Sequence, residues 1–260
     1  MVLKAHTVDY FSLEQYVAEE QEILSRFFGI DITISPPPEE LSKVMLKAKE
    51  IDWSQAEAHF LPNISLERYS NFPGWTIKPV EWFWKRIQKN ELGRDAAILD
   101  GDWVIADGSQ KPEYKEGKQM YENDPFAKVI RGLRKAGKIQ IPLWVKSISQ
   151  DSRFAISYDE IQNFVNSAIS NLLDVHPDRV RLPRAIEHNF LSNLYHPELG
   201  KTTSWEWCQD LFSDGLPLLW GRSFSGGLGA FDCTATIRHG DHIGFRTLIV
   251  FPRTSNKKLW

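Results

Sequence analysis

The sequence predicts an α+β fold, and three observations carry that prediction. The first hundred residues contain stretches with the apolar period of amphipathic helices. From about Ile98 the residue pattern changes to short strand-like runs separated by Gly, Asp and Pro. Two further helical stretches lie between residues 157 and 194, before a C-terminal part of short apolar runs. We therefore expect a helical N-terminal extension over residues 1–95 that packs on a main domain over residues 96–260.

Three helices are expected in the N-terminal extension. Apolar residues recur along one helical stripe through residues 12–28, and Gly29 supplies the stop. Three prolines precede the second helix, whose Glu39 and Glu40 suit the positive end of the helix dipole. The third is expected over residues 79–90.

The main domain is predicted to begin with a strand and a turn over residues 98–114, and residues 121–145 indicate a short helix followed by a strand. Ser157 and Glu160 then have the spacing of a capping box, in which each side chain satisfies the other residue's backbone N–H. A long amphipathic helix is expected after them, and another near Pro183.

Composition excludes several classes of protein. A net charge of -3 and a pI near 6.2, with scattered Lys and Arg, give no reason to expect a nucleic-acid partner. No stretch approaches the roughly 18 apolar residues of a membrane span, so we expect no membrane insertion. The N-terminus lacks the apolar core of a signal peptide, so display on a cell or virus surface would need a partner or another route. The two cysteines are too few for a disulfide framework.

Five short motifs follow one another between residues 154 and 251. They are "FAISYDEIQNFVNSAI", "VRLPRAIEHNFL", "SWEWCQD", "LPLLWGRS" and "HIGFRTLIVF". Their order resembles the formylglycine-generating-enzyme branch of the C-type lectin fold, which implies a C-type lectin-like main domain. The chain departs from that family at Ala185–His188, in place of Glu-Ala-Glu-Trp, and at Gly221–Ser223, in place of Gly-Gly-Ser. These departures weaken the enzyme assignment more than the fold assignment.

The residues that carry chemistry in that family are not matched here. Its oxidases need a cysteine pair after the Gly-Gly-Ser turn, where this chain offers Cys233 alone, with Cys208 upstream. Its iron-dependent relatives use a His-x-x-x-His pair, a spacing that none of the seven histidines has. A metal cluster of His239, Asp241 and His242 is conceivable on ligand chemistry, but adjacent polar residues in a Gly-rich loop are more often solvated. Glu187 and Glu206 are expected to tie loops to helices. We predict no catalytic residue, no metal and no cofactor.

The composition of the C-terminal segment is unusual. Lys, Glu, Gln, Met and Trp make up 58 of the 260 residues, yet none occurs from Gly221 to Asn256. These five are the residues that codons of the form NNC or NNT cannot encode. The segment resembles the variable region of a diversity-generating retroelement, in which a reverse transcriptase randomises adenines so that Asn codons become NNC or NNT. The known variable proteins of that family have the C-type lectin fold and typically end the variable region with Ile-Gly-Phe-Arg.

That resemblance divides residues 220–246 into two sets. The framework residues keep the backbone in place: Trp220, Gly221, Ser223, Ile243, Gly244, Phe245 and Arg246. The variable positions are expected to face a ligand from loops and strands over a rigid scaffold. They are Arg222, Phe224, Ser225, Gly226, Leu228, Phe231, Asp232, Cys233, Thr234, Thr236, Ile237, Arg238, His239, Asp241 and His242.

The predicted function is therefore non-catalytic binding of a varied ligand, an unknown protein or cell-surface molecule. Exposed aromatic and aliphatic residues beside small polar ones are typical of such binding surfaces. Two alternatives stay open: a formylglycine-generating-enzyme-like oxidoreductase, and a structural protein of a virus-like particle. The ligand and the oligomeric state are not predicted.

Overall fold

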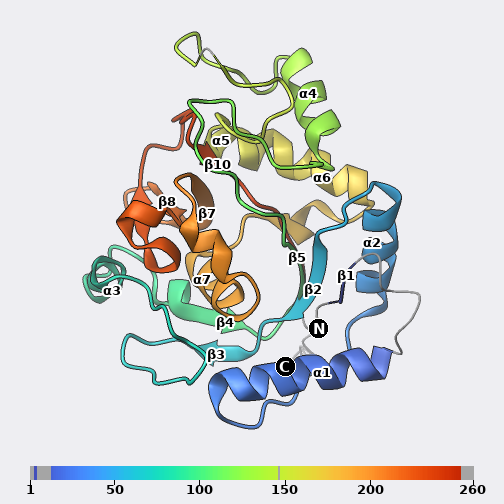
Figure 1. Ribbon diagram of the computed structural model, residues 1–260, viewed down its shortest axis with the longest axis vertical. Coiled ribbons are helices and arrows are strands. Elements are labelled where there is room, and N and C mark those ends of the chain that lie inside the picture. The colour runs from blue at the N-terminus through green and yellow to red at the C-terminus, as the bar shows by residue number, and fades with distance from the viewer. Residues whose placement is uncertain (1–2, 5–12, 146, 253–260) are drawn as a thin grey trace, which may run out of the picture.

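The structure, a computed structural model, describes residues 3–4, 13–145 and 147–252. It is a mixed α+β fold in which helices surround two main sheets (Figure 1), as the sequence predicts at that level. The larger sheet is antiparallel throughout and has the strand order β1-β2-β5-β11-β6. Its strands are β1 (Leu3–Lys4), β2 (Ala56–Phe60), β5 (Trp103–Asp107), β6 (Val180–Arg181) and β11 (Leu248–Phe251).

The second sheet carries the C-terminal segment. Its order is β10-β7-β8-β9, with β10 parallel to β7 and the other pairs antiparallel. The strands are β7 (Trp205–Leu211), β8 (Pro217–Trp220), β9 (Phe231–Cys233) and β10 (Ile243–Gly244). A separate pair is formed by β3 (Asn63–Ser65) and β4 (Ile98–Asp100). Trp220 pairs with both Glu206 and Phe231. Residues 220–246, called the variable segment after the expectation above, therefore begin in the middle of this sheet.

Helices account for the rest of the regular structure. The α-helices are α1 (Leu13–Phe28), α2 (Glu39–Glu50), α3 (Glu81–Gln88), α4 (Ala127–Lys135), α5 (Tyr158–Glu160), α6 (Asn166–Leu173) and α7 (Ala185–Leu194). A π-helical segment, η2 (Ile161–Val165), joins α5 to α6. Short 3₁₀ turns are η1 (Arg94–Ala97), η3 (Pro177–Arg179), η4 (Pro197–Lys201), η5 (Ser223–Ser225) and η6 (Gly227–Gly229). Within the described residues, no helix is long and apolar enough to cross a membrane.

The predicted helices are confirmed where the pattern was strongest. The three expected N-terminal helices are α1, α2 and α3, and the long one over residues 158–173 is interrupted only by its π-helical segment. Ser157 and Glu160 form the capping box in both directions: Ser157 N–H donates to Glu160 Oε2 at 2.9 Å, and Glu160 N–H to Ser157 Oγ at 3.3 Å. Two reciprocal bonds at the helix start leave fewer unpaired N–H groups there.

Two expectations about the fold need correction. Residues 1–95 do more than form a helical extension, because β2 is fully buried within the large sheet between β1 and β5. One hydrophobic core runs across the expected boundary, from Tyr16 to Phe251. The strand expected before residue 145 is also absent: Val145 N–H donates to the Pro142 carbonyl at 2.9 Å, which closes a turn instead. Pro142 has no backbone N–H to donate to a neighbouring strand, which favours a turn over a β-strand here.

Candidate ligand-binding face

The C-terminal end of the variable segment is held by a buried cation. Arg246 donates from Nη1 to the Ser109 carbonyl at 2.9 Å and from Nη2 to Glu206 Oε1 at 3.0 Å. The Arg246 guanidinium and the Glu206 carboxylate are both almost completely buried. Burial alone would raise the pKa of Glu206, but the charges of Arg246 and Lys111 lower it to about 2. Arg246 therefore bonds a buried carbonyl and a buried carboxylate.

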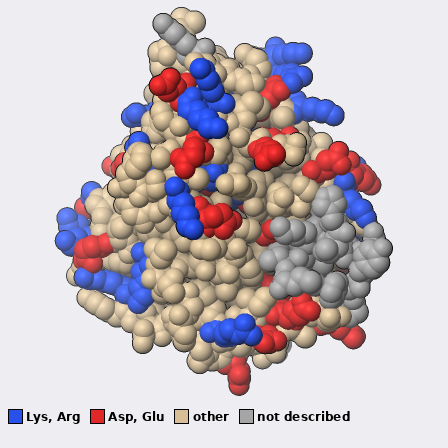
Figure 2. Space-filling view, in the orientation of Figure 1, with Lys and Arg blue, Asp and Glu red and all other residues tan. Residues whose placement is uncertain are grey.

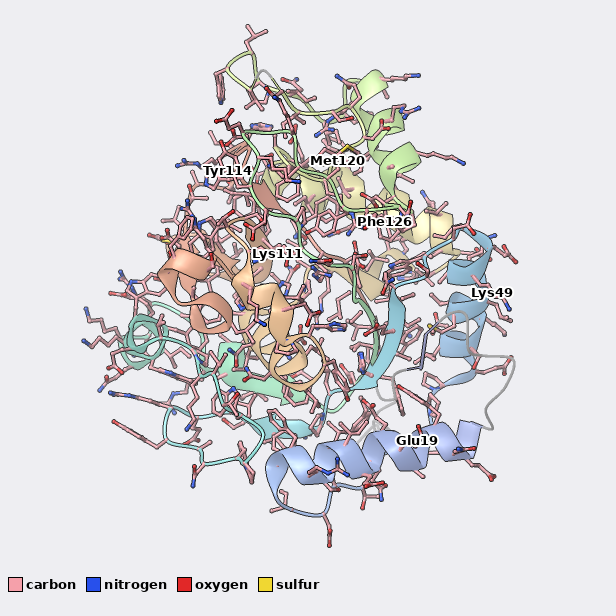
Figure 3. The ribbon with its side chains drawn as sticks, in the orientation of Figure 1. Glu19, Lys49, Lys111, Tyr114, Met120 and Phe126 are labelled. Carbon is pink, nitrogen blue, oxygen red and sulfur yellow. The ribbon has the colours of Figure 1, made fainter. Side chains whose placement is uncertain are left out.

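The N-terminal end is held by a second buried cation. Lys111 Nζ donates to the Gly221 carbonyl at 2.5 Å and to the Ser204 carbonyl at 3.1 Å. Figure 3 shows Lys111 near the middle of the molecule, and its side chain is 1% exposed. Burial lowers the pKa of Lys111 to about 8, a shift that Glu206 partly opposes. Gly221 has a φ of +93°, and a Cβ there would lie 2.8 Å from Nζ, so glycine lets the backbone approach the amine.

The middle of the segment folds back onto the core. Leu228 and Phe231 are 1% and 8% exposed, which corrects their placement among ligand-facing residues. The Phe231 ring stacks on Phe83 of α3 with centroids 4.9 Å apart. The carbonyl of Leu228 accepts hydrogen bonds from Asn189 Nδ2 at 2.7 Å and from Trp220 Nε1 at 3.0 Å. These two apolar side chains therefore belong to the scaffold.

One exposed part of the segment lies around η5. The Phe224 ring is 72% exposed and lies under the Arg222 guanidinium, with 4.9 Å between Cζ and the ring centroid. Nearby, Tyr114 Oη donates to Asp241 Oδ2 at 2.9 Å, and His242 Nδ1 lies 3.2 Å from Asp241 Oδ1. Burial, and then the bond to Asp241, raises the pKa of Tyr114, while the charge of Arg222 acts in the opposite sense. Residues from three loops therefore meet on one surface.

A second exposed part covers residues 232–239, where Asp232, Ile237 and Arg238 are exposed. Thr236 Oγ1 donates to Asp159 Oδ2 at 3.0 Å. His239 Nε2 lies 2.8 Å from Glu160 Oε2. Burial would raise the pKa of Glu160, but His239 and two backbone donors lower it.

The polar residues considered as metal ligands are separated by these contacts. His239 is paired with Glu160, whereas His242 is paired with Asp241. Across the described residues, no group of three or more His, Cys, Asp or Glu side chains has the arrangement of a metal site.

The two cysteines are free thiols in different surroundings. Cys208 is buried in β7, and Cys233 is partly exposed on β9. Burial raises the pKa of both thiols, and nearby carboxylates raise it further. Because the thiolate is the reactive form, both environments disfavour thiol chemistry.

Sequence reasoning missed the loop of residues 110–120 that supports the face. Lys111, Tyr114 and Gln119 all contact the variable segment, Gln119 through a hydrogen bond from Nε2 to the Asp241 carbonyl. The loop has no periodic pattern and lies about a hundred residues before the segment. No signal in a single sequence would have joined the two.

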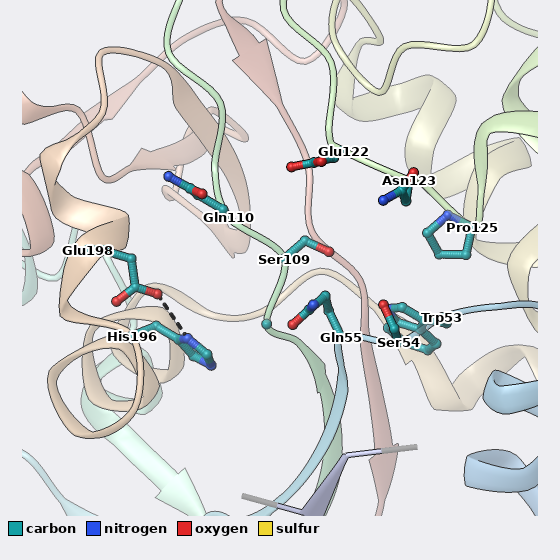
Figure 4. Close-up of a pocket in the computed structure, with 11 residues that line it drawn as sticks. Trp53, Ser54, Gln55, Ser109, Gln110, Glu122, Asn123, Pro125, His196 and Glu198 are labelled. Carbon is teal, nitrogen blue, oxygen red and sulfur yellow. Dashed lines mark hydrogen bonds and ion pairs between the residues drawn. The ribbon is translucent and has the colours of Figure 1, made fainter. Parts of the chain in front are cut away.

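A polar cavity of about 390 Å³ lies elsewhere, between the loops at residues 53–55, 108–110 and 122–125 and the end of α7 (Figure 4). None of the predicted site residues lines it. Its histidine, His196, has Nε2 at 2.6 Å from Glu57 Oε2 and Nδ1 at 3.1 Å from Glu198 Oε1. Both ring nitrogens are engaged by carboxylates, so the ring has no free nitrogen to act as a base.

No protein-family model matches the chain, and neither a curated protein nor a solved structure matches it.

Proposed function

We propose that the chain is a non-catalytic ligand-binding protein whose surface at the variable positions is diversified by a retroelement, on a C-type lectin-like domain. The observation that carries this proposal is how burial divides residues 220–246. Six of the seven framework residues are buried, and Ser223 is half-buried. Thirteen of the fifteen variable positions are exposed or partly exposed. The framework residues thus hold the segment in the core while most of the variable positions face outward, which is the arrangement that a diversified binding surface requires.

The contacts that hold the segment support the same proposal, because most of them use its backbone. Ser223 N–H donates to the Thr202 carbonyl at 2.8 Å, and the Gly240 carbonyl accepts from Ala155 N–H at 3.2 Å. The carbonyls of Gly221 and Asp241 accept from the side chains of Lys111 and Gln119. Backbone atoms are present whichever side chain a diversified codon encodes. The surface side chains can therefore vary while the hydrogen bonds that hold the segment stay the same.

The exposed side chains fit a protein ligand best. Phe224 and Ile237 are 72% and 71% exposed, and each offers an apolar group beside an arginine. Aromatic and arginine residues dominate the binding energy of protein interfaces, and charges at the rim guide the choice of partner. The ligand class we propose is therefore a protein on another cell, a virus or a host.

The genomic neighbourhood tests the retroelement. We expect a near-copy of the codons for residues 220–246, with Asn codons at the variable positions, beside a gene for a reverse transcriptase. A neighbourhood without that copy would remove the basis for diversification. Copper-dependent thiol oxidation by the purified protein, lost on Cys233→Ser, would instead favour the oxidoreductase.

A stability measurement tests the division into two sets. The triple variant Phe224→Ser, Ile237→Asn and Arg238→Gly replaces exposed residues with others that NNC or NNT codons supply. We expect its Tm to stay within about 2 °C of the parent, because exposed substitutions cost little. The control, Ile243→Asn, buries a polar amide at a framework position. It should lower the Tm several times as much as the triple variant does. Equal losses in the two proteins would contradict the proposal.

A further inference from the structure

A protruding turn at one end of the molecule carries two fully displayed apolar side chains. Leu143 is 96% exposed and Trp144 is 75% exposed. They occupy the two central positions of the turn closed by the hydrogen bond from Val145 N–H to the Pro142 carbonyl. Those positions in turns usually hold Gly, Asn, Asp or Ser, whose side chains suit water. In Figure 1 the loop containing this turn, at the top, extends beyond the rest of the molecule next to α4.

The base of this loop is attached to the core. Ile139 is 1% exposed, and Gln140 N–H donates to Glu160 Oε1 at 2.8 Å. On the returning side, Arg134 Nη1 donates to the Ser149 carbonyl at 2.7 Å. The apolar pair is thus presented outward by a loop that is fixed at both sides.

Basic residues flank the turn in the sequence. The stretch from Phe126 to Gln150 contains six Lys or Arg residues and no Asp or Glu. Four of these cations are exposed and lie on α4 or just after it: Lys128, Arg131, Lys135 and Lys138. Figure 2 shows Lys and Arg side chains over α4, and acidic side chains below the protruding loop. Arg131 is paired with Asp151, and Lys138 Nζ lies 5.5 Å from the centroid of the Phe164 ring while Lys138 stays exposed. The lysines therefore supply most of the charge available to a partner.

We propose that the turn Pro142–Val145 inserts Leu143 and Trp144 into the interfacial layer of a membrane that contains anionic lipid. Tryptophan is enriched at the level of lipid headgroups, where its ring is partly apolar and its N–H is hydrated. Lys135 and Lys138 lie against the headgroups, because an anionic leaflet attracts clusters of basic residues. Both contributions, apolar insertion and charge attraction, are needed for stable peripheral binding.

The shape of the tip favours a lipid surface over a protein one. A protein partner would need a concave pocket for the tip and a surrounding rim that excludes water. Lipid headgroups can rearrange around a convex tip, so a membrane surface needs no preformed pocket for it. This mode is adsorption to one leaflet and not a membrane span, but it departs from the expectation of no membrane insertion. It also gives a route to surface display that does not depend on the variable positions, and it does not rest on the function proposed above.

Vesicle flotation with the full chain tests whether Leu143 and Trp144 insert into an anionic membrane surface. The probes are vesicles of phosphatidylcholine alone and vesicles that also contain about 30% phosphatidylserine. We expect binding to the anionic vesicles, reduced at least about ten-fold by Leu143→Ser combined with Trp144→Ala. The matched control is Tyr69→Ala, which removes an aromatic ring that is 81% exposed on another loop and should leave binding unchanged. All these residues are exposed, so unchanged circular dichroism should show that each variant is folded.

A second pair of variants tests the charges. Lys135→Glu combined with Lys138→Glu should reduce binding to anionic vesicles by about ten-fold or more, and about 1 M salt should weaken the binding of the parent protein. Lys85→Glu, on α3, is the control and should bind like the parent. The proposal is overturned if anionic vesicles bind no better than neutral ones, or if the tip variant binds like the parent. It is also overturned if the parent is an oligomer that Trp144→Ala converts to monomers without any vesicle binding, since the tip would then join copies of this chain.

Discussion

Arg246 Nη2 lies 3.0 Å from Glu206 Oε1, and neither side chain has significant contact with solvent. The pair joins the end of the variable segment to β7, and Tyr121 Oη also donates to Glu206. Arg153 and Asp107 form a second buried pair nearby, and Asp107 is also close to Arg246. Several buried charges therefore compensate one another beneath the proposed ligand-binding face.

Removing the Arg246 side chain should destabilise the protein strongly. Arg246→Met leaves Glu206 buried beside fewer positive charges, and we expect the free energy of unfolding to fall by about 3–5 kcal/mol. Urea denaturation of both proteins measures the difference. Arg238→Met, at an exposed variable position, is the control and should change stability by less than about 0.5 kcal/mol. Similar values for the two variants would show that Arg246 is not a framework residue.

Phe231 and Phe224 should respond differently to the same substitution. The sequence placed Phe231 among the positions expected to face a ligand. Since Phe231 is 8% exposed and stacked on Phe83, we now expect Phe231→Ala to cost about 3–5 kcal/mol. Phe224→Ala should cost less than about 0.5 kcal/mol, because its ring is mostly in water. Thermal unfolding compares the two, and a stable Phe231→Ala protein would restore that ring to the ligand-binding face.

Gly221→Ala tests the close approach between the backbone and Lys111. The new Cβ would have both the strain of a positive φ and a contact of 2.8 Å with the amine, which must then leave the Gly221 carbonyl. We expect a loss of about 2–3 kcal/mol. Gly215→Ala is a matched control, since Gly215 has a φ of +82° and open space around its Cα. It should lose only about 1 kcal/mol, and equal losses in urea denaturation would mean that the Lys111 contact contributes nothing.

Stability should fall as the pH rises past neutrality because of His59. Its ring lies between Glu20 of α1 and Glu57 of β2, with nitrogen–oxygen distances of 3.6 and 3.5 Å. Burial would lower the pKa of His59, but these carboxylates raise it to about 9. The folded pKa exceeds the unfolded value of about 6.5, so the stabilisation is complete below pH ~6.5 and is lost as the pH rises through ~9. The expected loss is up to about 3 kcal/mol.

The difference in unfolding free energy between the parent and His59→Gln isolates this effect. Lys111, whose pKa is lowered to about 8, makes stability rise with pH above that value, but it is present in both proteins and cancels. The difference should shrink between pH ~6.5 and ~9.5. A difference that stays constant over this interval would contradict a protonated His59 in the folded protein.

The sequence by itself determined the helices and the irregular character of the C-terminal segment. Apolar period and capping residues are local properties, so α1, α2, α3 and the capping box at Ser157 were all predicted. Phe245 and Arg246, which a motif marked as framework positions, are both buried.

Only the tertiary structure decided which side chains of that segment reach solvent. Leu228 and Phe231 are apolar like Phe224 and Ile237, and nothing within the segment separates the two pairs. They are buried because α3 and α7 pack against η6 and β9, contacts made by residues far away in the chain. The place of β2 inside the large sheet and the support from Lys111 and Gln119 depend on equally distant partners. Such contacts leave no periodic trace in one sequence, since each depends on how the whole chain folds.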